Sequence, residues 1–333
     1  MILVTGGTGL VGAHLLYHLS LENDSIRAIF RPNSNLKAVE KVFEFYNSPS
    51  NLFQKIEWIK ADITDIVELE QAFEGITHVY HAAALISFKP SDFKLLLKTN
   101  IEGTTNVVNL CIANSVKKLC YVSSIATIEK SVHNKPITED NEWNIERNNY
   151  GYAITKHAAE MEVWRASQEG VPVVIVNPGI ILGAGFWKSG SGAIFSKVKK
   201  GLRFYTEGIT GFVGVTDVAK IMISLMHFPI QNERYILVAE NVSFKYVFDT
   251  IATCFNVKKP SVKVTVLLSE IGWRIAWVLS LFSKKQPIIT KHSAKSIHTK
   301  NIFSSEKIKE ALNYNFEPIS TVIAKICAAY KKE

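Results

Sequence analysis

The first twelve residues, MILVTGGTGLVG, run from a short apolar stretch straight into a turn with a glycine at every third position. Gly6, Gly9 and Gly12 have the spacing that permits a tight turn, lets the backbone approach a pyrophosphate and packs a helix closely on the strand. The helix that follows presents free N–H groups and its positive dipole end to phosphates. Because the turn follows the first strand of a βαβ unit, we predict that it binds a dinucleotide, with Thr8 and Leu10 in the same site.

Apolar, β-rich runs alternate with stretches of helical periodicity along the first half of the chain. The pattern predicts strands over residues 1–4, 25–30, 56–60, 78–80, 118–122 and 173–176, and helices over 10–22, 66–73, 93–114 and 150–170. The second crossover, 33–55, is expected to hold a helix followed by the Asn-Ser-Pro-Ser-Asn loop at 47–51. Strand–helix alternation implies right-handed crossovers and a sheet covered on both faces. We therefore predict an α/β fold with a Rossmann-type doubly wound parallel sheet.

The pattern changes after Pro178. Glycine becomes frequent, and short strands and helices follow in mixed order to the end of the chain. We predict an NAD(P)-binding Rossmann domain over 1–177 and a smaller, mixed substrate-binding region over 178–333. A strand near 235–238 can return to the main sheet.

Charge and hydropathy exclude several classes of protein. The 333 residues carry a net charge of +8, but the lysines are scattered, so we expect solvated faces and no nucleic-acid partner. The longest apolar run, 271–282, is interrupted by Arg274 and is shorter than the ~18 residues of a membrane span. We expect a buried or partly exposed helix there and no integral membrane segment, with contact to a membrane surface as the alternative.

The four cysteines lie far apart and form no CxxC pair. Their spacing predicts neither a metal site nor a disulfide framework, and it fits a reducing compartment. The chain begins directly with a predicted strand, which leaves no room for a signal peptide. We therefore expect a cytoplasmic protein without a bound metal.

The end of the second strand bears on the choice between NAD and NADP. A strand that selects NAD usually ends in Asp or Glu, which binds the ribose 2′-OH, but here Phe30 takes that position and Arg31 follows it. An arginine there can pair with a 2′-phosphate, or it can merely cover the adenine or the surface. We expect NADP as the cofactor, with NAD as the alternative.

Two further strand ends belong to the same site. Asp62 and Ile63 follow the third strand, where the carboxylate can accept a hydrogen bond from the adenine amino group or cap the next helix. Ala82, Ala83 and Ala84 follow the fourth strand at the carboxyl edge of the sheet, where open α/β folds bind ligands. Their small side chains leave room for the ribose and phosphates of the cofactor.

Tyr152 and Lys156 lie one helical turn apart on the same face of the predicted 150–170 helix. A nearby ammonium lowers the pKa of a phenol, which can exchange a proton with a carbonyl or alcohol oxygen while hydride passes to or from nicotinamide. The Tyr-x-x-x-Lys pattern is expected about once by chance in such a chain, so its position before the 173–176 strand gives it its value. Tyr150 has no matching lysine, because Ile154 stands four positions on.

Ser123 and Ser124 end the apolar strand over 118–122 at the carboxyl edge of the sheet. A hydroxyl there can hydrogen-bond a substrate oxygen and orient it toward Tyr152. The alternative is that both serines satisfy backbone groups of the loop. The presence of Tyr152 and Lys156 favours the catalytic role.

These motifs occur in one order along the chain: residues 5–12, Asp62, 81–84, Asn100 in Asn-Ile-Glu-Gly-Thr, Ser123-Ser124, Tyr152 with Lys156, and Asn177-Pro-Gly179. As a set, the motifs resemble the extended short-chain dehydrogenases/reductases, the group of NAD-dependent epimerase/dehydratases and dihydroflavonol reductase-like enzymes. The resemblance covers about residues 1–240 well and the remainder loosely.

The resemblance implies a role for each matching residue. Ser124, with Ser123 as a close alternative, would be the catalytic hydroxyl, and Tyr152 the general acid/base. Lys156 would bind the nicotinamide ribose and tune Tyr152. The remaining matches are Asn100, which would support the active-site geometry, and Pro178 and Gly179, which would lie beside the nicotinamide ring.

The resemblance also bears on the substrate. Dehydratases of this family usually carry an Asp-Glu pair directly after the catalytic hydroxyl, whereas Ile125 and Ala126 follow Ser124 here. The arginine-ended second strand is similar to that of dihydroflavonol reductase-like members. Residues on the predicted substrate side are largely apolar or aromatic, which favours a hydrophobic ligand. The residues that we assign to the substrate are Phe88, Ser123, Asn177, Phe186 and Trp187.

We therefore predict an NADP-preferring reductase or dehydrogenase that interconverts a carbonyl and an alcohol on a small hydrophobic ketone, aldehyde or sterol-like substrate. Two alternatives stay open: a nucleotide-sugar epimerase that works through a transient ketone, and a regulatory protein that senses the dinucleotide without catalysis. The intact Ser, Tyr and Lys argue against the regulator. Family members often form homodimers through the helices that follow Phe93 and Tyr150, and the resemblance implies the same contact here.

Overall fold

The computed structural model describes residues 1–23, 25–47, 49, 51–129, 135–144, 149–282 and 297–332. Its centre is a seven-stranded sheet in the order β10-β6-β5-β4-β1-β2-β3, in which all neighbouring strands are parallel. The strands are β1 (Ile2–Thr5), β2 (Ile26–Phe30), β3 (Ile56–Lys60), β4 (His78–His81), β5 (Lys118–Val122), β6 (Val173–Pro178) and β10 (Glu233–Leu237). The strand order runs outward in both directions from β1 and β4, which confirms the predicted Rossmann fold.

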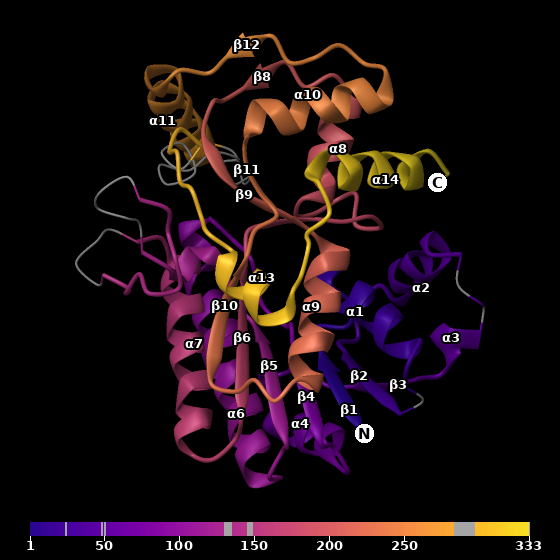
Figure 1. Cartoon of the computed structure of the whole chain (residues 1–333). Coiled ribbons are helices and arrows are strands. Elements are labelled where there is room, and N and C mark those ends of the chain that lie inside the picture. The colour runs from indigo at the N-terminus through magenta and orange to yellow at the C-terminus, as the bar shows by residue number, and fades with distance from the viewer. Residues whose placement is uncertain are drawn as a thin grey trace.

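Helices cover both faces of this sheet (Figure 1). One face carries α1 (Leu10–Ser20), α2 (Leu36–Phe45) and α9 (Val215–His227), and the other carries α4 (Ile66–Phe73), α6 (Gly103–Ala113) and α7 (Gly151–Gln168). Neighbouring residues of β1 illustrate the alternation, because Val4 packs with the first set of helices and Leu3 with the second. Burial on both faces explains why the strands are continuous apolar runs in the sequence.

Two predicted helices differ from those observed. The second crossover holds α2 and the short α3 (Asn51–Gln54), and its predicted 47–51 loop lies partly outside the described residues. The single helix predicted over 93–114 is α5 (Phe93–Leu96), a π-helical segment η2 (Leu97–Glu102) and α6. A π-helical segment widens the helix locally and occurs frequently at functional sites.

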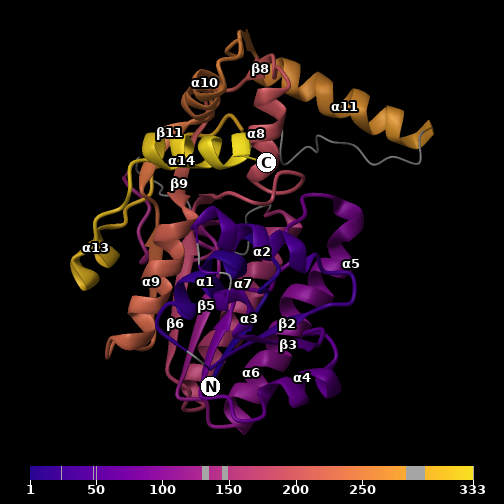
Figure 2. The same ribbon diagram turned by 90° about the vertical axis from the view of Figure 1, so that its right-hand side faces the viewer.

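A smaller lobe lies beyond the carboxyl ends of the parallel strands (Figure 1). Its elements are β7 (Ile180–Leu182), β8 (Phe204–Tyr205), β9 (Ile209–Gly214), β11 (Glu240–Ser243), β12 (Val262–Lys263), α8 (Gly192–Lys199), α10 (Phe244–Phe255), α11 (Val266–Phe282) and α14 (Ile319–Lys332). The short helix α13 (Glu306–Leu312) instead packs against β10, and its Ile308 joins the core beside the main sheet. The strands form two small sheets, β11-β9-β7 and β12-β8. Figure 2 shows α11, which contains the apolar run noted in the sequence, projecting from this lobe.

The predicted division at residue 177 stays a prediction. The strand predicted near 235–238 is β10, which pairs with β6 in the main sheet, and α9 packs against α1. The chain therefore returns to the main sheet after it has begun the small lobe.

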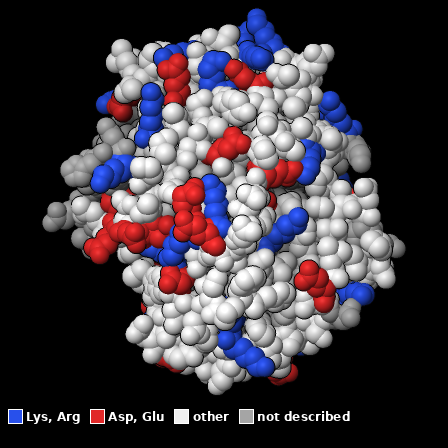
Figure 3. All heavy atoms as spheres, in the orientation of Figure 1, with Lys and Arg blue, Asp and Glu red and all other residues white. Residues whose placement is uncertain are grey.

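The structure also describes the distribution of surface charge, the apolar helices, the possible metal ligands and the cysteines. Lys and Arg side chains are interspersed with Asp and Glu over the face shown in Figure 3. Among the described residues, no helix is long and apolar enough to cross a membrane and no cluster of side chains could hold a metal ion. The four cysteines are free thiols.

Candidate active site

The glycine turn between β1 and α1 packs backbone against backbone. Gly6 has a φ of +71°, and a Cβ there would lie 2.5 Å from the backbone nitrogen of Ala83. A Cβ on Gly12 would lie 2.2 Å from the carbonyl oxygen of Gly6. The N–H of Gly9 donates to that same carbonyl at 2.9 Å and closes the turn. Glycine is therefore required at the first and third positions of the motif.

A cavity of about 240 Å³ opens beside this turn. The predicted cofactor residues that line it are Gly6, Thr8, Gly9, Arg31, Asp62, Ile63, Ala82, Ala83 and Ala84. They come from the carboxyl ends of β1, β2, β3 and β4, where a Rossmann sheet binds its ligands. The predicted cofactor residues that are not among its described lining are Leu10, Gly12, Lys156, Pro178 and Gly179.

The end of β2 is joined to the glycine turn through Ser34. The Ser34 hydroxyl oxygen accepts a hydrogen bond from the N–H of Arg31 at 3.1 Å and one from the Thr8 hydroxyl at 3.3 Å. Arg31 is exposed where it lines the cavity. Arg27 is buried instead, and its guanidinium pairs with Glu57 at 3.1 Å and donates to two backbone carbonyls. Arg31 is therefore the arginine of this strand end that a ligand can reach.

Asp62 lines the cavity and does not cap the following helix. Its Oδ1 accepts hydrogen bonds from the N–H and the hydroxyl of Thr64, both at 2.9 Å. The cap of α4 is Asp65, whose side chain accepts from the N–H groups of Val67 and Glu68. Of the two roles expected for Asp62, the structure thus removes capping.

Tyr152 lies in the first turn of α7 and is 8% exposed. Its ring centroid is 6.0 Å from that of Phe88 and 6.2 Å from that of Tyr150. Burial raises the pKa of Tyr152 to about 12, and a hydrogen bond with the Ser124 side chain partly opposes this rise. The phenol is therefore protonated at neutral pH, beside a hydroxyl and between two aromatic rings.

Lys156 is fully buried one turn further along α7. Its Nζ donates to the Tyr121 hydroxyl at 2.5 Å and to the Val122 carbonyl at 2.8 Å. Burial lowers the pKa of Lys156 to about 7, while the Glu160 carboxylate raises it. The expected lowering of the Tyr152 pKa by this ammonium is not the dominant effect, because burial raises the pKa of the phenol instead.

A buried polar chain leads from Lys156 back to the glycine turn. Tyr121 lies between Lys156 and His81, whose ring stacks on the Tyr121 ring with centroids 5.3 Å apart. The two ring nitrogens of His81 lie 2.6 Å from the Thr5 hydroxyl and 2.9 Å from the Thr104 hydroxyl. Burial, and then the charge of Lys156, lower the pKa of His81 to about 3, so its imidazole is neutral at physiological pH.

Two residues predicted to contact the substrate are engaged inside the protein. Ser123 is 3% exposed, and its hydroxyl donates to Glu160 at 2.5 Å. Asn177 is fully buried, and its amide nitrogen donates to Glu160 and to the Thr127 hydroxyl, both at 3.0 Å. These contacts occupy the Ser123 hydroxyl and the Asn177 amide nitrogen, whereas the Asn177 Oδ1 is buried and has no hydrogen-bond partner among the described residues. A substrate role for either residue stays a prediction. Of the two serines, Ser124 is the one whose side chain hydrogen-bonds Tyr152.

Asn100 lies in η2 and is buried. Its Oδ1 accepts from the N–H of Leu85 at 2.7 Å, and its Nδ2 donates to the Leu85 carbonyl and to the Thr155 hydroxyl, both at 3.1 Å. Leu85 lines the cavity and Thr155 lies in α7. Asn100 therefore joins the cavity wall to the helix that carries Tyr152 and Lys156, which suits the supporting role expected of it.

The three predicted substrate aromatics lie in different places. Phe88 is half exposed and borders Tyr152. Phe186 packs at the margin of the main-sheet core. Trp187 packs in the core of the small lobe, with its ring centroid 4.5 Å from that of Tyr330. Among the described residues, ring contacts join Phe88 to Tyr152 but not the other two.

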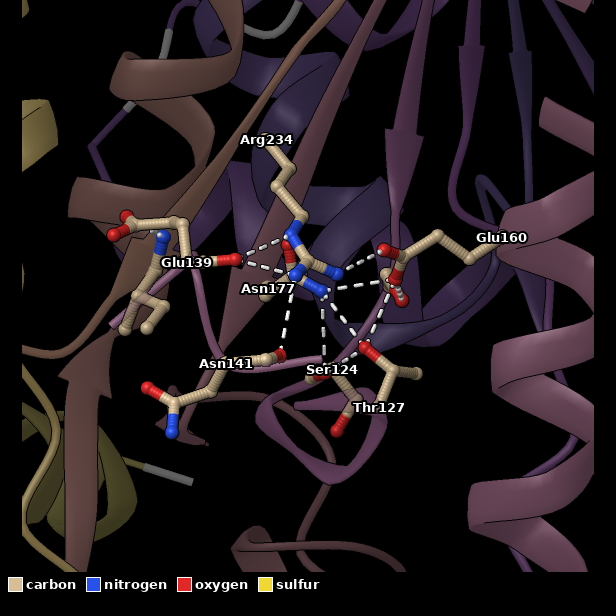
Figure 4. Close-up of polar contacts among 9 residues, drawn as sticks. Ser124, Thr127, Glu139, Asn141, Glu160, Asn177 and Arg234 are labelled. Atoms are coloured by element: carbon tan, nitrogen blue, oxygen red, sulfur yellow. Dashed lines mark hydrogen bonds and ion pairs between the residues drawn. The ribbon is translucent and has the colours of Figure 1, made fainter. Parts of the chain in front are cut away.

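A buried ion pair lies under the site and belongs to no motif. Glu160 of α7 is fully buried and pairs with Arg234 of β10 at 3.2 Å (Figure 4). Glu160 follows Tyr152 and Lys156 at the same interval of four residues, so the helical spacing could have indicated it. Arg234 gives no comparable signal, because the pairing of β10 with β6 brings it to the site.

Comparison with known proteins agrees with this arrangement. The model of the NAD-dependent epimerase/dehydratase family matches residues 2–237. The chain belongs to this family. The match confirms the resemblance drawn from the motifs, and the family is one of NAD-dependent enzymes.

Two curated relatives and one solved structure are similar to this family member over most of its length. It is 28% identical over 288 residues to a putative dihydroflavonol 4-reductase of Synechocystis sp., covering 83% of this chain and 77% of the relative. It is 26% identical over 273 residues to sterol demethylase protein B of Methylococcus capsulatus, covering 80% and 78%. The crystal structure of gox2253 superposes with a TM-score of 0.83 at 25% identity, covering 100% of this chain and 98% of the other.

Proposed function

We propose that this epimerase/dehydratase family member is a reductase that uses NADPH to convert a small hydrophobic carbonyl compound into an alcohol, with Tyr152 as the proton donor. The observation that carries the proposal is the arrangement at the start of α7, where the buried Tyr152 phenol hydrogen-bonds Ser124 one helical turn before the buried Lys156. Reduction of a carbonyl consumes one proton at the oxygen, and a buried phenol that keeps its proton at neutral pH can supply it.

The cavity beside the glycine turn is placed to receive the adenosine and pyrophosphate end of a dinucleotide. The absence of Cβ atoms at Gly6 and Gly12 brings the turn and the start of α1 together, so backbone N–H groups can hold the pyrophosphate. Asp62 would receive the adenine, and Arg31 would hold a 2′-phosphate in the absence of an acidic residue at the end of β2. When bound, the nicotinamide would supply the hydride.

The chain's own groups would handle the oxygen and its proton. Ser124 would hydrogen-bond the substrate oxygen and orient it toward the phenol of Tyr152. Lys156 would bind the nicotinamide ribose and stabilise the phenolate left after proton transfer. The buried contacts of Lys156 with Tyr121 and Val122 keep its ammonium close to that site.

The substrate class is inferred from the apolar side chains at the site. Ile86 and Phe88 follow β4 and are 64% and 50% exposed, and Phe88 borders Tyr152. Exposed large apolar side chains beside a polar catalytic group favour a hydrophobic ligand. The names of the two relatives, a dihydroflavonol reductase and a sterol demethylase protein, support the same class of substrate.

Cofactor binding by calorimetry tests the proposal first. We expect NADPH to bind more tightly than NADH, and Arg31→Ala to reduce that preference by about 10- to 100-fold because it removes a charged hydrogen bond. Arg274→Ala, the same change at an exposed arginine of α11, is the matched control and should leave the preference intact. Hydrophobic ketones and aldehydes would then be screened for oxidation of NADPH.

A different result would assign the site to the alternative reaction of this family. Equal binding of NADH and NADPH, with interconversion of an added UDP-sugar and no net change in the cofactor, would indicate epimerisation through a transient ketone. The absence of any hydrophobic carbonyl substrate in the same screen would strengthen that assignment.

We also propose that two copies associate through α5 and α7. Phe93 of α5 and Ile154 and Met161 of α7 are large apolar side chains that are 38%, 39% and 42% exposed. A two-fold contact would remove this apolar surface from water. Light scattering should give the mass of two chains, and Met161→Glu should give the mass of one. A single-chain mass for the unaltered protein would refute the dimer.

A further inference from the structure

Glu160 lies in a buried polar cluster that includes Thr127, Asn177 and Arg234 and extends to Ser124 (Figure 4). Its Oε2 accepts from the Ser123 hydroxyl at 2.5 Å, from the Thr127 hydroxyl at 2.9 Å and from the Asn177 amide at 3.0 Å. Its Oε1 accepts from the Arg234 guanidinium at 3.2 Å. The donors come from the segment after β5, from β6 and from β10. One carboxylate thus ties together three strands and the catalytic helix.

The cluster reaches Ser124 through its backbone carbonyl. The Thr127 hydroxyl and the Asn177 amide nitrogen lie 2.9 Å and 3.3 Å from the Ser124 carbonyl oxygen. Both donors also lie within hydrogen-bond distance of Glu160. The carboxylate therefore contacts the same two side chains that contact the Ser124 carbonyl, and this links α7 to the Ser124 backbone.

Arg234 holds the carboxylate from the other side. Its Nε donates to the Glu139 carbonyl at 3.1 Å, and its Nη2 donates to the same oxygen and to the Asn141 carbonyl (Figure 4). The Glu139 carboxylate in turn accepts from the N–H of Ile236 at 2.7 Å. The guanidinium is therefore fixed in place, and its charge balances that of Glu160, which would be costly to bury unpaired.

Glu160 also acts on Lys156 by its charge. Tyr152, Lys156 and Glu160 follow at intervals of four residues and share one face of α7. The carboxylate raises the pKa of Lys156 against the effect of burial. The other titratable groups named around Lys156 are Tyr121 of β5, which accepts from its Nζ, Tyr152 of α7, whose pKa burial raises, and His81 of β4, which is neutral. None of the three supplies a negative charge at neutral pH.

We propose that Glu160, paired with Arg234, is a positioning residue of this active site. It holds Ser124 in place through two shared donors, and it supports the ammonium form of Lys156. Glu160 is fully buried, so it acts through these residues. The inference deepens the proposed reductase function and rests on it.

Glu160→Gln tests the inference, because it keeps the shape of the side chain and removes the charge. We expect kcat for carbonyl reduction to fall by about 10- to 100-fold through misplacement of Ser124, with little change in the Kd for NADPH. We also expect the alkaline limb of the kcat profile to move to lower pH, because Lys156 loses its proton more easily. Glu162→Gln is the matched control on the same helix, and it should change neither quantity.

Two further variants separate positioning from a merely structural ion pair. Glu160→Gln combined with Arg234→Gln removes both charges and leaves no unpaired charge. We expect this double variant to regain stability but neither kcat nor the position of the alkaline limb. Thr127→Val breaks one link to Ser124 without a change of charge, so it should lower kcat by about tenfold and leave the limb in place.

The pH dependence of the free energy of unfolding measures the effect of the Glu160 charge on Lys156, and it needs no substrate. The folded-state pKa of Lys156, about 7, lies below its ordinary value of 10.5, so the unfolded chain binds one more proton between these values. The free energy of unfolding therefore gains a contribution that rises with pH across this window. In Glu160→Gln the rise should begin at a lower pH, and in Lys156→Met it should be absent.

The inference is overturned by a folded Glu160→Gln protein that keeps its kcat and its alkaline limb. It is also overturned if the double variant regains both, or if the onset of the unfolding rise does not move. The unfolding measurement needs no substrate. A failed search for a carbonyl substrate therefore counts against the proposed function alone, and an unmoved onset counts against the role of Glu160 alone.

Discussion

The two parts of the molecule bury different kinds of side chain. The core of the small lobe is built from α8, α10 and α14 and packs apolar residues such as Phe195, Ile251 and Ile323. Beside the main sheet, Lys156 and Glu160 are just as deeply buried on α7. Buried charge is costly unless it is paired and hydrogen-bonded, so a fold that places it at one sheet edge has a use for it there. The comparison assigns chemistry to the main sheet and mainly packing to the core of the small lobe.

Tyr152→Phe should have the largest effect. The change keeps the buried ring and removes the proton, so we expect kcat for carbonyl reduction to fall by about a thousandfold. Oxidation of NADPH with the best substrate from the screen measures the rate, and calorimetry should show unchanged NADPH binding. Activity close to that of the unaltered protein would show that another group donates the proton. It would also contradict the assignment of the reaction to this edge of the main sheet.

Trp187→Ala tests whether the small lobe contributes more than packing. Trp187 lies in the core of that lobe against Phe195 and Tyr330, so its loss should lower the free energy of unfolding by about 3 kcal/mol with little change in KM. Denaturant unfolding and steady-state kinetics measure the two quantities.

Phe88→Ala is the matched aromatic change at the main-sheet edge. Because Phe88 is half exposed and borders Tyr152, the variant should raise KM with little loss of stability. A raised KM for Trp187→Ala would support the predicted substrate role of Trp187. It would contradict the assignment of packing alone to the core of the small lobe.

The same contrast between chemistry and packing is expected within the site, between the adjacent residues Ser123 and Ser124. Ser124 hydrogen-bonds Tyr152, whereas the Ser123 hydroxyl is committed to Glu160. Ser124→Ala should lower kcat by about a hundredfold through the loss of one donor to the substrate oxygen. Ser123→Ala should instead lower the free energy of unfolding by about 1–3 kcal/mol, because one donor to a buried carboxylate is lost. The opposite outcome, with kcat more sensitive at Ser123, would make Ser123 the catalytic hydroxyl.

The sequence predicts the local patterns of the site but not the contacts that depend on how distant segments pack. The glycine spacing, the buried strands and the Tyr152–Lys156 interval are local patterns set by backbone geometry, and the structure contains each of them at the sheet edge. The Glu160–Arg234 pair joins residues 74 positions apart, so it depends on the pairing of β10 with β6. The burial that raises the pKa of Tyr152 is likewise a property of the packed fold, which a pairwise argument about a nearby lysine does not include.

Acid should separate the two parts through the protonation of buried histidines. His81 has a folded-state pKa of about 3, below its ordinary value of 6.5, so between these values the unfolded chain binds one more proton. The free energy of unfolding should therefore fall as the pH drops below about 6.5, by at most ~1.4 kcal/mol per pH unit for this group. His14 of α1, with a pKa lowered by burial to about 4, adds a second contribution of the same sign.

Both of these histidines belong to the main-sheet part, and α8, α10 and α14 contain none. Urea unfolding followed across this pH range should thus show a slope that His81→Asn reduces by the share of one proton. An unchanged slope would mean that His81 binds its proton as readily in the folded protein as in the unfolded chain. The assignment of a neutral His81 imidazole between Thr5 and Thr104 would then be wrong. The inference that burial sets the charge states of the polar groups beside the main sheet would be wrong with it.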